Sequence, residues 1–299
     1  MFERFPNTSG PSRPRSNDRH SAGSLRTERV PLTALASPSP ANGRSGSSRI
    51  DWDTRAKASG LHLLLSLGLA CLAAFLVFGL WYPDAYQVMA GGRELFLLVS
   101  VVDVVIGPML TFAVFDHAKG LRALRRDLVV IGTLQVSALV YGMHTVYIAR
   151  PVGIVFEVDR FRLVTADAVL QSELPEAAEA FRKLPLTGPW LIGARRPEAG
   201  SERNDALFLG AAGIDVGQRP RFWQPYEASR SAAREKSRPL QELFDHAPDR
   251  ASQLKAQVAR FGVDPVTARF LPIMARGDWV AILDHDGNVL GHLNADGFF

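Results

Sequence analysis

The stretch ASGLHLLLSLGLACLAAFLVFGLW, residues 58–81, decides the fold together with LFLLVSVVDVVIGPMLTFAVF, residues 95–115, and LVVIGTLQVSALVYGMHTVYI, residues 128–148. Each stretch has about 20 mostly apolar residues, which as a helix span about 30 Å, the thickness of the hydrocarbon core of a bilayer. A helix of this length in a soluble core would keep a polar face, and none of the three has one. We therefore predict an integral membrane protein with three transmembrane helices.

The rest of the 299 residues divides around these helices. Residues 1–50 are rich in Ser, Pro, Arg, Asn and Gly, a composition that buries too little apolar surface to offset chain entropy. A disordered cytoplasmic tail is predicted there, and a later start of translation is the alternative. The first apolar stretch lies too far into the chain for a cleavable signal peptide. The transmembrane region then covers 58–149, and 151–299 has the length of one soluble domain.

Basic residues near the helix ends predict the orientation. The loop 82–94 carries only Arg93 as a basic residue, whereas the segments before the first helix and after the second are rich in them: Arg44, Arg49, Arg55 and Lys57, then Lys119, Arg122, Arg125 and Arg126. Such residues stay in the cytoplasm. The tail and the second loop are therefore predicted inside, and the first loop and the domain 151–299 in the periplasm of a Gram-negative cell, with the helices in its inner membrane.

The segment 151–299 is predicted to be an α+β domain with a mostly antiparallel sheet. Runs of β-branched and apolar residues predict strands at 152–158, 160–164, 189–193 and 270–274, and a terminal hairpin of 279–283 with 289–293 around an Asp-Gly turn. Helical spacing predicts helices at 174–184, 226–234, 239–247 and 249–261.

Reaction chemistry is not predicted by any motif. The net charge of +4 does not describe a nucleic-acid binder, and the nucleophile, zinc, phosphate and dinucleotide motifs are missing from the sequence. The run Asp284–Asn288 is interpreted as a turn, because a calcium loop would need its Gly and a distal Glu at other positions. Glu157 and Asp159, near Arg160 and Arg162, are interpreted as ion-paired residues on one face of a strand. No catalytic residue, cofactor or metal site is expected.

Two features inside the membrane are candidate contacts. Asp103 lies about 15 Å from the outer end of the second helix, where a carboxylate costs at least ~2.5 kcal/mol unless it is protonated, paired or turned toward other helices. Its neighbour by depth is Gln135, so the pair either joins helices two and three or serves as a polar anchor or proton relay. Ser66, Ala70 and Ala74 recur at a spacing of four. Such small residues allow close approach, either of a partner helix or of the other two spans.

Several short stretches follow one another in a recognisable order: Trp81-Tyr82-Pro83, Gly91-Gly92, Val102–Pro108, Arg125–Leu128, Ala149–Val152, Phe156–Phe161, Leu184–Pro189 and Leu283–Leu290. With these stretches, residues 58–299 resemble the TfpX/TfpZ-type type IV pilin accessory proteins, which are encoded beside pilin genes in Gram-negative bacteria. The tail before residue 50 has no counterpart. The resemblance implies an inner-membrane accessory factor for a cognate type IV pilin, with no enzymatic activity and no known catalytic residue.

The layout suits that role, because helices in the bilayer and a domain outside can contact both parts of a pilin before assembly. We predict a non-catalytic chaperone or assembly factor that contacts the pilin, the lipid bilayer and other pilus assembly proteins. A membrane enzyme that modifies pilin or envelope substrates is the first alternative, and the missing motifs argue against it. An envelope sensor is the second, and the lack of a cytoplasmic output domain in the sequence argues against it.

Overall fold

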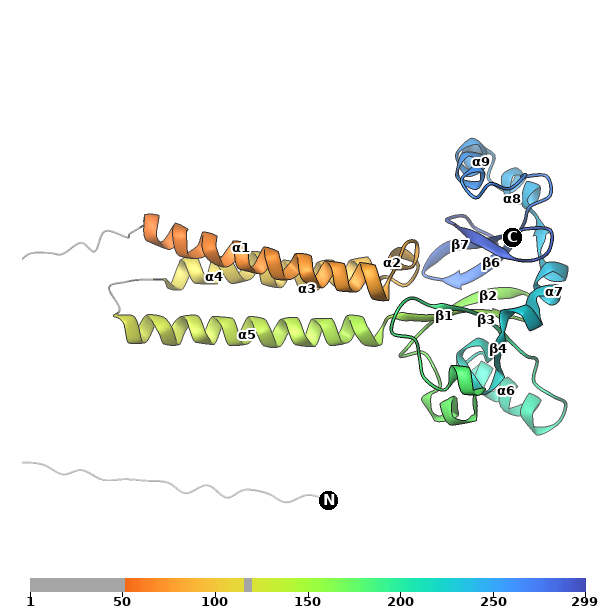
Figure 1. Cartoon of the computed structure of the whole chain (residues 1–299), viewed down its shortest axis with the longest axis horizontal. Coiled ribbons are helices and arrows are strands. Elements are labelled where there is room, and N and C mark those ends of the chain that lie inside the picture. The colour runs from red at the N-terminus through yellow and green to blue at the C-terminus, as the bar shows by residue number, and fades with distance from the viewer. Residues whose placement is uncertain (1–51, 116–119) are drawn as a thin grey trace, which may run out of the picture. The chain divides into compact units, whose positions relative to one another are not determined.

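The computed structural model describes residues 52–115 and 120–299 (Figure 1). The predicted tail, residues 1–50, lies outside the described residues. Three helices in the described ranges are long and apolar enough to cross a membrane, at 52–81, 92–114 and 121–148. The first comprises α1 (Trp52–Leu76) and a π-helical turn (Val77–Trp81), and the third is α5 (Leu121–Ile148). The second comprises α3 (Gly92–Val101), a π-helical turn (Val102–Ile106) and α4 (Gly107–Val114). The three predicted helices are confirmed.

The second helix packs against both of the others. α1 lies along α4 and the π turn at 102–106, while α3 and α4 lie along α5. The side chains that point away from these contacts are apolar and exposed, such as Leu64 on α1 and Leu134 on α5. An apolar outer surface of this kind suits contact with lipid chains, which can satisfy no polar group.

Residues 151–299 form the sheet domain. Its strands are β1 (Pro151–Glu157), β2 (Arg160–Thr165), β3 (Trp190–Ala194), β4 (Trp223–Pro225), β5 (Arg238–Pro239), β6 (Arg269–Ala275), β7 (Gly277–Leu283) and β8 (Val289–Leu293). Their order is β4-β3-β1-β2-β6-β7-β8, with β5 also paired to β6. The pairs β1–β3 and β2–β6 are parallel and the rest antiparallel, which confirms the predicted α+β fold with a largely antiparallel sheet.

Helices cover this sheet and fill its core. They are α7 (Tyr226–Lys236), α8 (Leu240–His246) and α9 (Ala251–Ala259), whereas α6 (Ser201–Ala211) has no buried residue. Alternate residues of β7 enter different clusters, because successive side chains of a strand point to opposite faces. Trp279 and Ala281 pack with Phe156 and Tyr226, while Val280 and Ile282 pack with residues of α8 and α9. The core therefore lies on both faces of the sheet.

Two predictions for the sheet domain were wrong. Residues 174–184 do not form one helix: they belong to short 3₁₀ turns at Gln171–Glu176 and Glu179–Phe181, because Ala177 and Ala178 between them have extended backbone, with ψ of 157° and 147°. Asp159 does not lie on a strand with Glu157, because β1 ends at Glu157 and Asp159 belongs to the turn before β2. The predicted terminal hairpin is confirmed, and the Asp284 carboxylate closes its turn by accepting the N–H groups of Asp286 and Asn288 at 2.9 and 2.8 Å.

The loop between the first two helices belongs to the core of the sheet domain. This loop contains α2 (Tyr86–Met89), and the Met89 side chain is fully buried in the cluster that includes Phe156 and Tyr226. The Arg276 N–H donates to the Met89 carbonyl at 3.0 Å, and the Tyr86 ring lies 5.2 Å from the His292 ring. The sheet domain and the first loop are therefore on the same side of the membrane helices.

The ends of the first and third helices are fixed to each other and to the domain. The buried Tyr82 hydroxyl donates to the Val146 carbonyl at 2.8 Å. Arg150, also buried, donates to the carbonyls of Tyr147 at 2.9 Å and Pro185 at 3.2 Å. The Gly188 N–H donates to the Leu80 carbonyl at 2.8 Å. We call this set of contacts, together with those of α2, the junction.

We predict that acid weakens the junction through His292. Burial lowers the pKa of His292 from 6.5 to about 4. In the unfolded chain the ring takes up a proton near pH 6.5, whereas the folded protein keeps it neutral. Its contribution to stability is therefore complete above pH 6.5 and is lost as the pH falls toward 4. Between pH 6.5 and 4, the melting temperature of the detergent-purified protein should therefore fall less in the His292→Leu variant than in the unsubstituted protein.

The matched control is His285→Gln, because the His285 side chain is 74% exposed. This variant should keep the pH dependence of the original protein. An unchanged acid-induced drop in His292→Leu would contradict the prediction.

Candidate functional site

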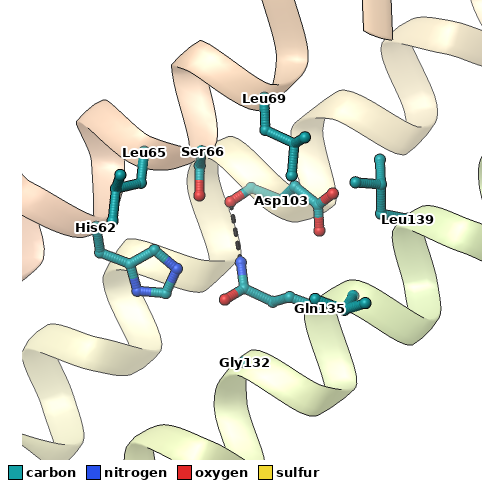
Figure 2. Close-up of a pocket in the computed structure, with 9 residues that line it drawn as sticks. His62, Leu65, Ser66, Leu69, Asp103, Gly132, Gln135 and Leu139 are labelled. Atoms are coloured by element: carbon teal, nitrogen blue, oxygen red, sulfur yellow. Dashed lines mark hydrogen bonds between the residues drawn. The ribbon is translucent and has the colours of Figure 1, made fainter. Parts of the chain in front are cut away.

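A cavity of about 190 Å³ lies between α1 and α5, and Asp103 of the second helix is among its lining residues (Figure 2). We call it the groove. One wall is formed by α1 and the other by α5, and their lining residues are His62, Leu65, Ser66 and Leu69, then Gly132, Gln135, Val136 and Leu139. On both helices these positions have the spacing i, i+3, i+4 and i+7, which places them on one face. One face of α1 and one face of α5 therefore line the groove.

The groove lies near the middle of the apolar segments. Asp103 has 11 residues of the second span on either side, since that span runs from 92 to 114. At 1.5 Å per residue each end is about 16 Å away. Gln135 lies near the centre of 121–148 and Ser66 near the centre of 52–81. The polar groups of the groove therefore occupy one level at mid-depth.

A missing backbone donor explains why Gln135 contacts the second helix. Asp103 belongs to a π turn, in which a carbonyl pairs with the N–H five residues later. Five residues after Asp103 comes Pro108, which has no N–H. The Gln135 side-chain amide donates instead to the Asp103 carbonyl, at 3.2 Å. This hydrogen bond joins helices two and three at a carbonyl that lies five residues before Pro108.

Gly107 provides the space for that amide. A Cβ atom at position 107 would lie 1.9 Å from Gln135 Nε2, so any larger residue would displace the amide. Two neighbouring polar groups are paired with α1: the Ser59 hydroxyl donates to the Pro108 carbonyl at 2.9 Å, and His62 Nδ1 lies 2.5 Å from Thr111 Oγ1. The polar groups in the middle of the second helix thus form hydrogen bonds with side chains of both α1 and α5.

The Asp103 carboxylate remains without such a partner. Only 6% of the residue is exposed, and its Oδ1 atom has no hydrogen-bond partner in the described part of the chain. Figure 2 shows the Asp103 side chain between the walls that α1 and α5 form. A buried polar atom of this kind costs free energy until a donor reaches it. The groove therefore combines apolar walls with one unsatisfied acceptor.

The structure brings together some of the residues predicted from the sequence and separates others. Asp103 and Gln135 meet, but through the Asp103 carbonyl rather than its carboxylate. Ser66 lines the groove, whereas Ala74 packs with the cluster at the junction end of the helices and Ala70 is half-buried outside the groove lining. His62, Gly107 and Gly132 were missed, although the five-residue spacing of Asp103 and Pro108 could have indicated an unpaired carbonyl.

The two buried glutamates of the sheet domain, Glu157 and Glu173, form ion pairs. Glu157 is buried and accepts from Arg162 Nε at 2.7 Å and from the Gly217 N–H at 2.7 Å. Burial raises the pKa of Glu157, and the neighbouring Arg162 opposes this increase. Glu173 and Arg219 are buried together, with Arg219 Nε 3.0 Å from Glu173 Oε1. Within 52–115 and 120–299, no three His, Cys, Asp or Glu residues are placed to hold a metal ion.

We predict that Gly107→Ala destabilises the contact between helices two and three. The added methyl group displaces the Gln135 amide and leaves the Asp103 carbonyl unpaired. The expected loss is about 0.6 to 1.7 kcal/mol, the order measured for hydrogen bonds between membrane helices. Gln135→Leu should cost a similar amount, and the double variant no more than either alone, because both remove one bond. Thermal unfolding in detergent measures these changes.

Gly132→Ala is the matched control, since a Cβ atom there meets nothing within 4 Å. It should not lower the melting temperature, because the added methyl group meets no neighbour and alanine favours the helix. Additive losses in the Gly107→Ala/Gln135→Leu variant would show that the two residues act separately.

Comparison with known proteins connects this structure to fimbriae. The family described as "Fimbrial assembly protein FimB" matches residues 50–91, a range that includes α1 and α2. "Fimbrial assembly protein, serogroup I" and "Fimbrial assembly protein, serogroup E1" of Dichelobacter nodosus are each 35% identical over 246 residues, 81% of this chain and 96% of theirs. A third protein of that organism, "Fimbrial assembly protein, serogroups C1 and C2", is 46% identical over 122 residues, 41% of this chain and 93% of its own length.

No solved structure matches the chain. The relatives of serogroups I and E1 nevertheless align over nearly their whole length, through the membrane helices and into the sheet domain. This chain therefore belongs to the FimB family of fimbrial assembly proteins.

Proposed function

We propose that this protein is a non-catalytic accessory factor of the inner membrane that supports assembly of a cognate type IV pilin. The observation that carries the proposal is the 35% identity to fimbrial assembly proteins over 81% of the chain. The resemblance of residues 58–299 to pilin accessory proteins supports the more specific role, that of an accessory factor for a type IV pilin. The role in fimbrial biogenesis comes from the relatives, and the pilin as direct partner is our inference.

The architecture supports contact with a subunit at two places. Met89 and Arg150 attach the sheet domain to the ends of the membrane helices, so surfaces inside and outside the membrane keep a fixed spacing. A pilin with one membrane helix and a globular head would meet both surfaces at once. Once one contact forms, the second becomes intramolecular and gains from a high effective concentration. Two weak contacts are then sufficient for specific binding.

The buried acids of the sheet domain support a structural role rather than acid–base chemistry. Glu157 is held by Arg162 and Glu173 by Arg219. A general base needs a free carboxylate beside a substrate position. Removal of either arginine would leave an uncompensated buried charge and destabilise the domain.

Deletion of the gene, followed by complementation, tests the proposal. Loss of surface pili with normal pilin synthesis, restored by the full chain, is expected, together with co-purification of the pilin in detergent. Normal piliation in the deletion strain would contradict it. A covalent change in the pilin that depends on this protein would favour the enzyme alternative.

We also predict that the sheet domain is periplasmic. Arg122, Arg125 and Arg126 begin α5, and such clusters remain in the cytoplasm. Alkaline phosphatase should therefore be active when fused after Phe299 and inactive when fused after Gly120. The reverse pattern of activity would overturn this topology, whereas the shared side of first loop and sheet domain would stand.

A further inference from the structure

We propose that the groove between α1 and α5 is the seat of one transmembrane helix of the pilin subunit, which places a hydroxyl or ammonium donor against the Asp103 carboxylate. The identity of the partner rests on the proposed function, but the chemistry of the seat rests on the groove alone. The inference assigns to Asp103 a contact with another protein rather than a role within the three-helix bundle.

The shape of the groove suits a helix. Each wall presents residues at i, i+3, i+4 and i+7 along its helix, the pattern by which two helices pack against a third. Between these walls, Gly132 adds no side chain, and a Cβ atom there would meet nothing within 4 Å. Small residues at such positions let a partner backbone approach closely. A polypeptide segment in the apolar core must be helical there, because its backbone N–H and C=O groups have to form hydrogen bonds with one another.

The unpaired carboxylate decides between a helix and a lipid. An acyl chain could cover Leu65, Leu69 and Leu139, but it carries no hydrogen-bond donor at mid-depth. Headgroup donors lie too far away, since Asp103 has 11 residues of its span on either side. An ionised carboxylate is satisfied by a hydroxyl or an ammonium group, and a protonated one by a hydroxyl. A protein helix with such a group at its centre fits both requirements.

Two other polar residues of the groove, Gln135 and His62, do not compete for this role. Gln135 donates to the Asp103 carbonyl and His62 lies beside Thr111, so both have contacts of their own. Asp103 Oδ1 has none in the described ranges, and only 6% of the residue is exposed. The acceptor is thus held ready before the partner arrives, which reduces the conformational entropy that binding costs.

Site-specific photocrosslinking in piliated cells tests the seat. A benzoylphenylalanine residue at Leu69 or Leu139 lies in the groove, whereas Leu64 and Leu134 point to the opposite faces of α1 and α5 and are 67% and 63% exposed. The pilin should crosslink at the two groove positions and not at the two controls. Crosslinking to a second copy of this chain, to no protein, or equally at all four positions would overturn the inference.

Two sets of variants separate shape from chemistry. Gly132→Leu puts a side chain into the groove and leaves residue 103 unchanged, and Gly68→Leu is its control, because position 68 is equally open but outside the groove lining. Crosslinking at Leu69 should fall at least tenfold in the first and stay unchanged in the second. Asp103→Leu should reduce co-purification of pilin about 3- to 20-fold, while Asp103→Asn, which keeps an acceptor, should retain it. Equal loss with Asn and Leu at equal protein level would contradict a hydrogen-bonding role.

The outcomes for the seat and for the proposed function are distinguishable. If the deletion strain loses pili and pilin crosslinks only to residues of the sheet domain, the seat is wrong and the function stands. If the deletion strain keeps its pili, the proposed function is wrong, and a crosslink at Leu69 to another membrane protein would then identify the occupant as a different partner.

Discussion

The missing N–H group of Pro108 accounts for the contact that joins the second and third helices at mid-depth. Lipid chains offer no substitute for a lost backbone hydrogen bond, so the carbonyl that Pro108 leaves unpaired has to be satisfied by another helix. Gln135 does so and thereby fixes the register of α5 against the second helix. Residue 107 has to be glycine for the same reason, because a Cβ atom there would displace the Gln135 amide. The π turn that accompanies this exchange also carries the Asp103 side chain, and π turns inside α-helices are frequent at functional sites.

The three contacts among the membrane helices are not equivalent. The second helix packs along both of its neighbours, whereas the first and third meet mainly at the junction, where the Tyr82 hydroxyl reaches the Val146 carbonyl. Toward the middle of the membrane they diverge and leave the groove between them. The bundle is thus closed at the end that carries the sheet domain and open at mid-depth. Because α1 and α5 are attached to each other mainly at the junction, their groove-lining faces can bind a partner without disturbing the sheet domain.

Hydrophobic length predicted the three long apolar helices correctly, because the bilayer imposes a minimum length on any helix that is to cross it. Counting residues from the helix ends also predicted that Asp103 and Gln135 lie at one depth. The atoms that meet were not predicted, since a π turn rotates the side chains that follow it and exposes a carbonyl. Likewise, α6 was missed because none of its residues is buried, and Leu207 and Phe208 face outward, so the helix has no apolar face to recognise. Strands β1, β2, β3, β6, β7 and β8 lie close to their predicted positions, because their apolar and β-branched residues are buried in a sheet. Strands β4 and β5 were missed, because they are only three and two residues long and contain no β-branched residue.

The position of Met89 has a consequence for how this family can be recombined. The core of the sheet domain is completed by a side chain that precedes the second membrane helix, more than sixty positions before β1 begins at Pro151. A fragment that starts at Pro151 would therefore expose a hole in its core where Met89 belongs. The sheet domain therefore includes the loop 82–91, and its boundary is not simply the point between α5 and β1 at residue 150. A chimera that exchanges sheet domains between relatives has to carry that loop with the domain. Otherwise the core of the new domain would be completed by the residue 89 side chain of the other protein.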